Sequence, residues 1–168
     1  MDFMGAILDG IAIAAIFNGM VASLVLINPR LFFDSYPKSI QKSAPKQMTK
    51  QEKRINLLLT ITIIGTCFVY SAISLLHSGV VGFWNLFWMG YIQWSILNAG
   101  DFLLLDCLLF QGKYKEKIVI PGTEGHKDYE FKNWMKHLAI YEHFLLVPFL
   151  LIPIISAIQA VIVVFLWK

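Results

Sequence analysis

The chain has 168 residues, of which 57% are hydrophobic and only 15% are charged. Soluble domains average about a quarter charged residues, so this composition excludes an ordinary water-soluble protein and indicates that lipid surrounds most of the chain. The net charge of +3 is small, and the position of the charges is more informative than their sum. We predict one all-α domain over residues 1–168, built as an integral membrane bundle of four transmembrane helices.

The first two apolar runs each reach the roughly 20 residues that a helix needs to cross a bilayer. Residues 3–27 contain Asp9 as their only charge and end at Asn28-Pro29-Arg30, where a proline and a cation stop the helix. Because this run lacks a basic start and an obvious cleavage site, we predict a retained helix and not a removed signal peptide. The second run, 55–76, carries no charge.

The third and fourth runs, 80–110 and 138–167, are longer than a bilayer requires. As a helix of about 1.5 Å per residue, the third would be about 46 Å long, against a hydrocarbon core of roughly 30 Å. It starts with a group of aromatic residues, which is typical of a membrane–water interface. The fourth contains Pro148 and Pro153, which membrane helices tolerate as kinks. We expect both helices to project past the bilayer on one side.

The basic residues predict the orientation. Thirteen of the fourteen Lys and Arg residues lie in segments 30–54 and 113–136. The positive-inside rule therefore places loops 28–54 and 111–137 in the cytosol and both termini on the non-cytosolic side. We predict a multi-pass protein of the cell membrane, such as a bacterial plasma membrane. Segment 30–54 is expected either to lie on the membrane with its lysines facing anionic lipid headgroups, or simply to anchor the topology.

Polar residues gather near the predicted cytosolic side. Counting about 20 residues inward from the outer ends of the third and fourth runs places Asp101, Asp106, Glu142 and His143 at the headgroup level. With about 100° per residue in an α-helix, the two aspartates lie about 140° apart, so Asn98 can join either one. Acidic and histidine side chains at a membrane are candidates for function, although capping or pairing with loop lysines explains them equally well.

The same α-helical geometry puts Lys136 on the face of His143, His137 on that of Tyr141, and Glu142 elsewhere. The loop residues that follow the Pro121-Gly122 turn could be directed inward, although a polar turn needs no functional explanation. The predicted catalytic residues are Asp101, Asp106, Glu124 and His143. The predicted substrate-binding residues are Asn98, His126, Tyr129, Lys136, His137 and Glu142.

Several chemistries have little support in the sequence. The Asp, Glu and His side chains could supply mixed oxygen and nitrogen ligands to a divalent metal ion, but no H-x-x-x-H or H-E-x-x-H spacing is present, so no metal ligand or cofactor is assigned. Cys67 and Cys107 form no C-x-x-C pair, which argues against thiol-redox chemistry. The basic residues flank predicted spans, so no nucleic-acid partner is expected.

One pattern resembles a known group of proteins. Asp101 and Asp106, followed by Ile120-Pro121-Gly122-Thr123-Glu124 and then by Tyr129 and His137, look like a pattern in small bacterial integral membrane proteins of unknown function. It covers less than a quarter of the chain. The resemblance implies no activity, but it implies that the third helix and the following loop form one unit.

Three classes of function remain open. The leading hypothesis is a membrane-embedded enzyme or binding protein for a lipid-like substrate, whose head is held at the cytosolic interface by the acids and, if it is anionic, by the loop lysines. The second is a subunit of an oligomeric transporter or channel, as a homo-oligomer or with a partner subunit, that uses the same carboxylates for cations or protons; a polar stripe through the full membrane depth would favour it. The third is a structural or regulatory protein without chemistry.

Overall fold

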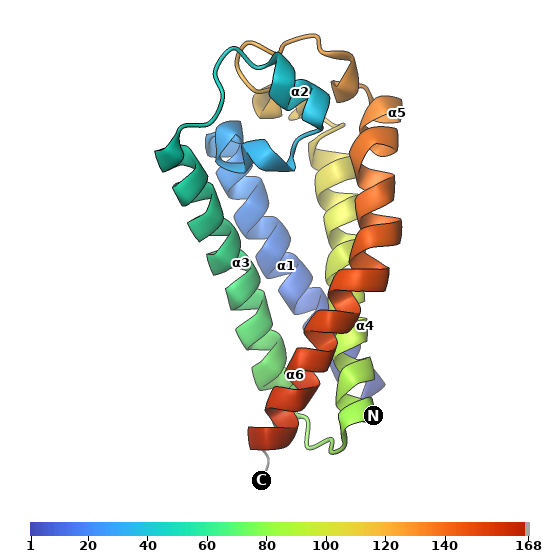
Figure 1. Ribbon diagram of the computed structural model, residues 1–168. Coiled ribbons are helices and arrows are strands. Elements are labelled where there is room, and N and C mark those ends of the chain that lie inside the picture. Colours follow the sequence, from blue (N-terminus) through green and yellow to red (C-terminus); the bar gives the residue numbers. More distant parts are fainter. Residues whose placement is uncertain (167–168) are drawn as a thin grey trace.

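The computed structural model describes residues 1–166, and this part of the chain is helical without any β-strand. Four helices are long and apolar enough to cross a membrane: Phe3–Ile27, Lys50–His77, Phe83–Leu109 and Phe131–Leu166. They run alternately up and down (Figure 1). The prediction of an all-α chain with four candidate spans is therefore confirmed. The two long connections lie at one end, called the loop end below; the N-terminus and the end of the fourth helix lie at the other, called the terminal end.

The first helix, α1 (Phe3–Ile27), has the limits expected from its sequence. The Asp2 side chain caps it by accepting a hydrogen bond from the Gly5 backbone N–H at 2.9 Å. At its other end the Asn28 side chain accepts from the Arg30 backbone N–H at 3.0 Å. Pro29 then starts the short 3₁₀ segment η1 (Pro29–Ser35), because proline has no N–H with which to continue the α-helical pattern.

The second long helix, α3 (Lys50–His77), begins at Lys50 and so includes a charged first turn ahead of the apolar run. Thr49 and Glu52 form a capping box: the Thr49 hydroxyl accepts from the Glu52 N–H at 3.2 Å, and the Glu52 carboxylate accepts from the Thr49 N–H at 2.8 Å. Arg30 Nε donates to Glu52 at 2.9 Å. The start of α3 is therefore attached to η1, the segment that directly follows α1.

The third helix changes its winding along its length. It starts as α4 (Phe83–Asp101) and continues as the π-helical segment η2 (Phe102–Leu109). A π-helix has hydrogen bonds between residues five apart, which makes its turn wider than that of an α-helix.

The fourth helix begins at Phe131, earlier than the apolar run, because its polar first turns are helical as well. It is π-wound where it passes η2. Pro148 lies inside its second π segment. Its successive parts are α5 (Phe131–Trp134), η5 (Met135–Ala139), η6 (Glu142–Leu151) and α6 (Ile152–Leu166).

The packing of the four helices is uneven. The third helix makes extensive contacts with α1 and α6, whereas α3 packs mainly on α1 and, toward the terminal end, on α6. In Figure 1, α3 and the fourth helix approach each other at the terminal end and separate toward the loop end.

The two long connections form a cap over the loop end with its own aromatic core. The Tyr36 ring meets the Trp134 ring edge-on at 5.8 Å, and the Tyr36 hydroxyl donates to the Ile118 carbonyl at 2.7 Å. Burial raises the pKa of Tyr36, so this hydroxyl stays protonated and remains a donor. Phe33 and Ile40 are buried beside it, each contributing about 1.5–3 kcal/mol by burial. Apolar residues of segment 30–54 thus pack on other parts of the same chain.

Candidate functional site

A cavity of about 380 Å³ lies in the loop-end half of the bundle. Its volume is within the roughly 300–1,000 Å³ of small-molecule sites. Its apolar lining consists of Phe17, Val21, Val25, Phe32, Ile63, Ile64, Leu105, Phe110, Leu138 and Leu151. Its polar lining consists of Ser35, Tyr36, Thr60, Asp101, Asp106, Glu142 and His143.

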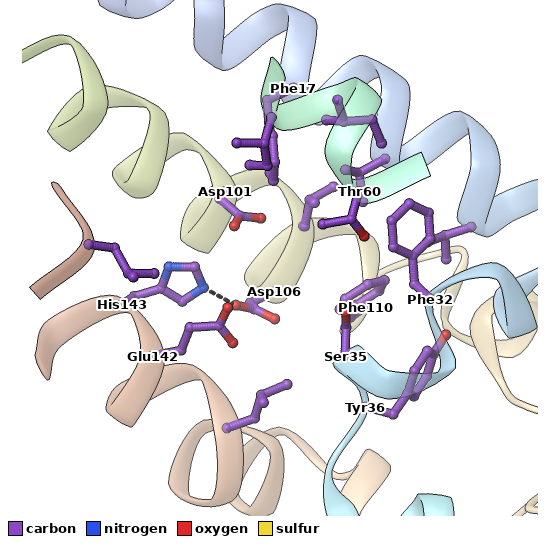
Figure 2. Close-up of a pocket in the computed structure, with 17 residues that line it drawn as sticks. Phe17, Phe32, Ser35, Tyr36, Thr60, Asp101, Asp106, Phe110, Glu142 and His143 are labelled. Carbon is purple, nitrogen blue, oxygen red and sulfur yellow. Dashed lines mark hydrogen bonds and ion pairs between the residues drawn. The ribbon is translucent and has the colours of Figure 1, made fainter. Parts of the chain in front are cut away.

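The titratable groups occupy one wall of this cavity. They come from the third helix (Asp101, Asp106) and the fourth (Glu142, His143), while α1 and α3 contribute apolar side chains and the Thr60 hydroxyl (Figure 2). The cavity therefore has an acidic wall and an apolar wall facing it. An amphiphile needs this combination, because its chain and its head require different surroundings.

His143 and Asp106 form the centre of the acidic wall. Both residues are 5% exposed. His143 Nε2 lies 2.8 Å from Asp106 Oδ2, and Trp134 Nε1 donates to the other carboxylate oxygen at 2.7 Å. On the far side of the ring, His143 Nδ1 lies 2.8 Å from Asn98 Oδ1, and the Asn98 amide nitrogen donates to the His143 carbonyl at 3.0 Å.

These contacts determine where the protons are. A carbonyl oxygen can only accept, so the Asn98 amide nitrogen faces it and Asn98 Oδ1 faces the ring. His143 Nδ1 must then donate, and Nε2 shares one further proton with Asp106. The pair carries a net charge of zero wherever that proton sits. His143 consequently has no free lone pair with which to act as a base in this arrangement.

Asp101 and Glu142 differ from Asp106 in having no hydrogen-bond partner among the described residues. Both line the cavity and are partly buried, yet neither carboxylate makes a hydrogen bond or an ion pair within residues 1–166. No Lys or Arg lines the cavity. Two carboxylates on different helices are thus directed into a space without a protein cation.

The π-helical winding explains why Asp101 and Asp106 face the same cavity. An α-helix would place them about 140° apart. From Phe102 onward the helix is π-wound, and its larger number of residues per turn brings residues five apart closer to one full turn than an α-helix does. The expected 140° separation of these two carboxylates is wrong for this reason. Glu142, expected on another face, also lines the cavity beside His143.

The predicted loop residues do not join this site. Glu124 is exposed and accepts from the Gly122 N–H at 2.9 Å, which lowers the pKa of its carboxyl. His126 accepts from the Asp128 N–H at 3.1 Å. The buried Tyr129 hydroxyl accepts from the Ile120 N–H at 3.0 Å and lies 2.9 Å from the Thr123 hydroxyl. None of them lines the cavity, and each stabilises the turn in which it lies.

The last two predicted binding residues lie outside the cavity as well. Lys136 is exposed. His137 Nδ1 lies 3.0 Å from Asp128, whose carboxylate also accepts from the Ser39 hydroxyl. Burial alone would raise the pKa of Asp128, but the Ser39 and His137 contacts outweigh it and hold this pKa below its usual value. This contact fastens α2 (Lys38–Ser43) to the fourth helix.

Sequence reasoning missed a second polar cluster, in the terminal half of the bundle. Gln93 and Gln159 are fully buried. Ser71 donates to Gln93 at 2.5 Å, and Gln159 accepts from Trp94 Nε1 at 3.0 Å. The cluster extends through Ser74 to Asp9. Each helix supplies only one or two of these polar residues, so no pattern within a single helix predicts the cluster. Trp134 and Asp128 were missed as well, because single residues of these types are common near membrane interfaces.

No three His, Cys, Asp or Glu side chains in residues 1–166 are placed to hold one metal ion. Comparison with protein-family models, curated proteins and solved structures gives no match. The fold and the cavity therefore define the class: a helical protein with four candidate membrane spans and an internal cavity that is acidic on one side and apolar on the other.

Proposed function

We propose that this chain is a multi-pass membrane protein that binds an amphiphilic, lipid-like ligand in the cavity between its helices. The observation that carries the proposal is the division of the 380 Å³ cavity into an acidic and an apolar wall. The apolar wall takes the chain of the ligand, and the acidic wall takes its head. Because both ring nitrogens of His143 are engaged in hydrogen bonds, this arrangement favours binding over acid–base catalysis by that residue.

Charge and exposure support an orientation in the membrane. Large apolar side chains are exposed along the long helices, for example Leu57, Ile61 and Phe149, and lipid would cover them. Thirteen of the fourteen Lys and Arg residues belong to segments 30–54 and 113–136, at or next to the cap. The positive-inside rule then places the cap in the cytosol and the termini outside, with the cavity on the cytosolic side of the midplane.

The exposed residues of the cavity lining suggest an entrance. Ser35 of η1, Thr60 of α3 and Leu151 of η6 line the cavity and are also exposed. They lie where α3 and the fourth helix separate. A ligand dissolved in the cytosolic leaflet would enter sideways between these two helices without leaving the membrane.

A transport role is the second candidate, and the buried polar cluster of the terminal half favours it. Gln93 and Trp94 belong to that cluster, and Asn98 follows just over one helical turn after Trp94 and contacts His143. Polar side chains thus occupy both halves of the bundle. In this reading the carboxylates bind a cation or protons, and the chain acts as a homo-oligomer or with a partner subunit.

Blocking the cavity tests the leading proposal. Purified protein in nanodiscs is titrated with dodecylamine, dodecanol and dodecanoate, and thermal stability is followed. At least one of the three should stabilise the protein in a saturable manner. Thr60→Trp fills the cavity wall and should abolish that effect, whereas Thr62→Trp, an exposed position on the same helix outside the lining, should retain it. No saturable effect from any probe, or equal effects in both variants, contradicts the proposal.

A further inference from the structure

We infer that the ligand of this cavity is a lipophilic amine, whose ammonium group sits between Asp101 and Glu142. The inference rests on the proposed function and goes further by naming the chemistry of the head group. It starts from the charges that line the cavity and from the partners that each of them has.

The acidic wall has more carboxyl groups than basic partners for them. Three carboxylates and one histidine line the cavity, and no Lys or Arg does. Asp106 is neutralised as a unit with His143, which lies 2.8 Å away. Asp101 and Glu142 remain, and neither makes a hydrogen bond or an ion pair within residues 1–166. The cavity therefore offers two carboxyl groups as hydrogen-bond acceptors and no Lys or Arg to pair with them.

The surroundings make this imbalance costly. Much of the lining is apolar, and a carboxylate removed from water without a partner is strongly disfavoured. A cation that enters the cavity would pair with the carboxylates and offset the loss of their hydration. An anionic head would find carboxyl groups and no Lys or Arg on the cavity lining. The sequence alone suggested an anionic head held by loop lysines, but none of those lysines lines the cavity.

The geometry favours an ammonium group. Asp101 comes from the third helix and Glu142 from the fourth, and both point toward the space beside His143 (Figure 2). A primary ammonium has three N–H donors, which can reach acceptors on two sides at once. The alkyl chain of such a ligand would extend along Phe17 and Ile63 on the opposite wall.

The test compares probes that share a chain and differ in the head. Wild-type protein in nanodiscs of zwitterionic lipid is titrated at pH 7 with dodecylamine, which is then protonated, with uncharged dodecanol, and with anionic dodecanoate. We expect dodecylamine to bind at least about ten-fold more tightly than dodecanol, and dodecanoate to bind weakest. In Asp101→Asn/Glu142→Gln the preference for the amine over the alcohol should fall to about one.

The two replacements remove unpaired charge from an apolar setting, so they should not unfold the protein. Asp101→Asn alone provides a milder variant, expected to lose part of the preference. Glu130→Gln, at an exposed acid before the fourth helix, serves as the matched control and should keep the wild-type ratio.

The outcomes separate the two proposals. If dodecanol binds as tightly as dodecylamine, or if the double variant keeps the wild-type preference, the amine inference is overturned; saturable binding that Thr60→Trp abolishes would then leave the proposed function standing. If none of the three probes binds saturably, the proposed function fails and the inference fails with it.

Discussion

Asp106 on the third helix and His143 on the fourth are joined at 2.8 Å, and each is also held from its far side, by Trp134 and by Asn98. The contact joins the two helices where both are π-wound. It fixes the acidic wall of the cavity while adding no net charge to it. Asp101 and Glu142 have no such hydrogen-bond partners among residues 1–166, and we propose that they bind the ligand.

Replacing one member of this pair should destabilise the protein strongly, whereas replacing both should destabilise it much less than the two single replacements together. Asp106→Leu and His143→Leu each leave a buried polar group unpaired, and each should lower the free energy of unfolding by about 3–5 kcal/mol. The double variant should lose clearly less than the sum of the two. Reversible unfolding in mixed micelles measures all three. Leu104→Ala, at an exposed position of the same segment, is the control; strictly additive losses would refute the coupling.

The close contact between α1 and α4 gives a second prediction. A Cβ added at Gly10 would lie 3.1 Å from the Gln93 Cα and 2.8 Å from the Ile96 side chain, whereas at Gly19 it would meet nothing within 4 Å. Gly10→Ala should therefore destabilise the protein by about 1–3 kcal/mol through overpacking. Gly19→Ala should stabilise it by up to about 1 kcal/mol, because alanine is the better helix former. Unfolding titrations of the two variants should shift in opposite directions, and shifts of one sign would refute the packing argument.

The cap gives a prediction about pH. The pKa of Asp128 is lowered in the folded protein, so its contribution to stability is fully present above the unfolded value of about 3.9 and is lost as the pH falls from there through the folded pKa. Protection of the cap backbone against hydrogen exchange, corrected for the intrinsic exchange rate at each pH, should fall across this window. Asp128→Asn should exchange faster already at neutral pH and change less on acidification. Asp34→Asn, at an exposed acid of η1, should behave like the wild type; an Asp128 variant with the full acid response would contradict the assignment.

These residues also show which parts of the structure the sequence could predict. The four helices follow from long apolar runs, since only the length and polarity of a segment enter that inference. Asp101, Asp106, Glu142 and His143 stand out because they are titratable groups beside apolar runs. Their convergence on one cavity was not predictable, because it depends on π-helical winding. No residue pattern in η2 marks that winding, and Pro148 in η6 predicts a kink but not the facing of the carboxylates. The place of Glu124 was not predictable either, because the loop satisfies its own polar groups.

The buried cluster of the terminal half gives the last prediction. Gln159 accepts from Trp94 Nε1 at 3.0 Å and donates to the Phe68 carbonyl at 3.0 Å. The Phe68 carbonyl keeps its bond within α3 when Gln159 is removed, but Gln159→Leu leaves the Trp94 N–H unpaired and should cost about 1–3 kcal/mol for that buried group. Ser156, one turn away on α6, has a buried hydroxyl without a hydrogen-bond partner in the described chain. Ser156→Ala should therefore be neutral or stabilising, since it removes a polar atom that gains nothing from burial.

Equilibrium unfolding of the Gln159 and Ser156 variants measures the difference, and dodecylamine titration adds a second readout. Both variants should keep the preference for the amine over the alcohol, because the cluster lies outside the cavity lining. A Gln159→Leu protein as stable as the wild type would show that the cluster does not hold the four helices together. The polar side chains of the terminal half would then need another explanation, and passage of a cation or protons along the bundle would be the first to test.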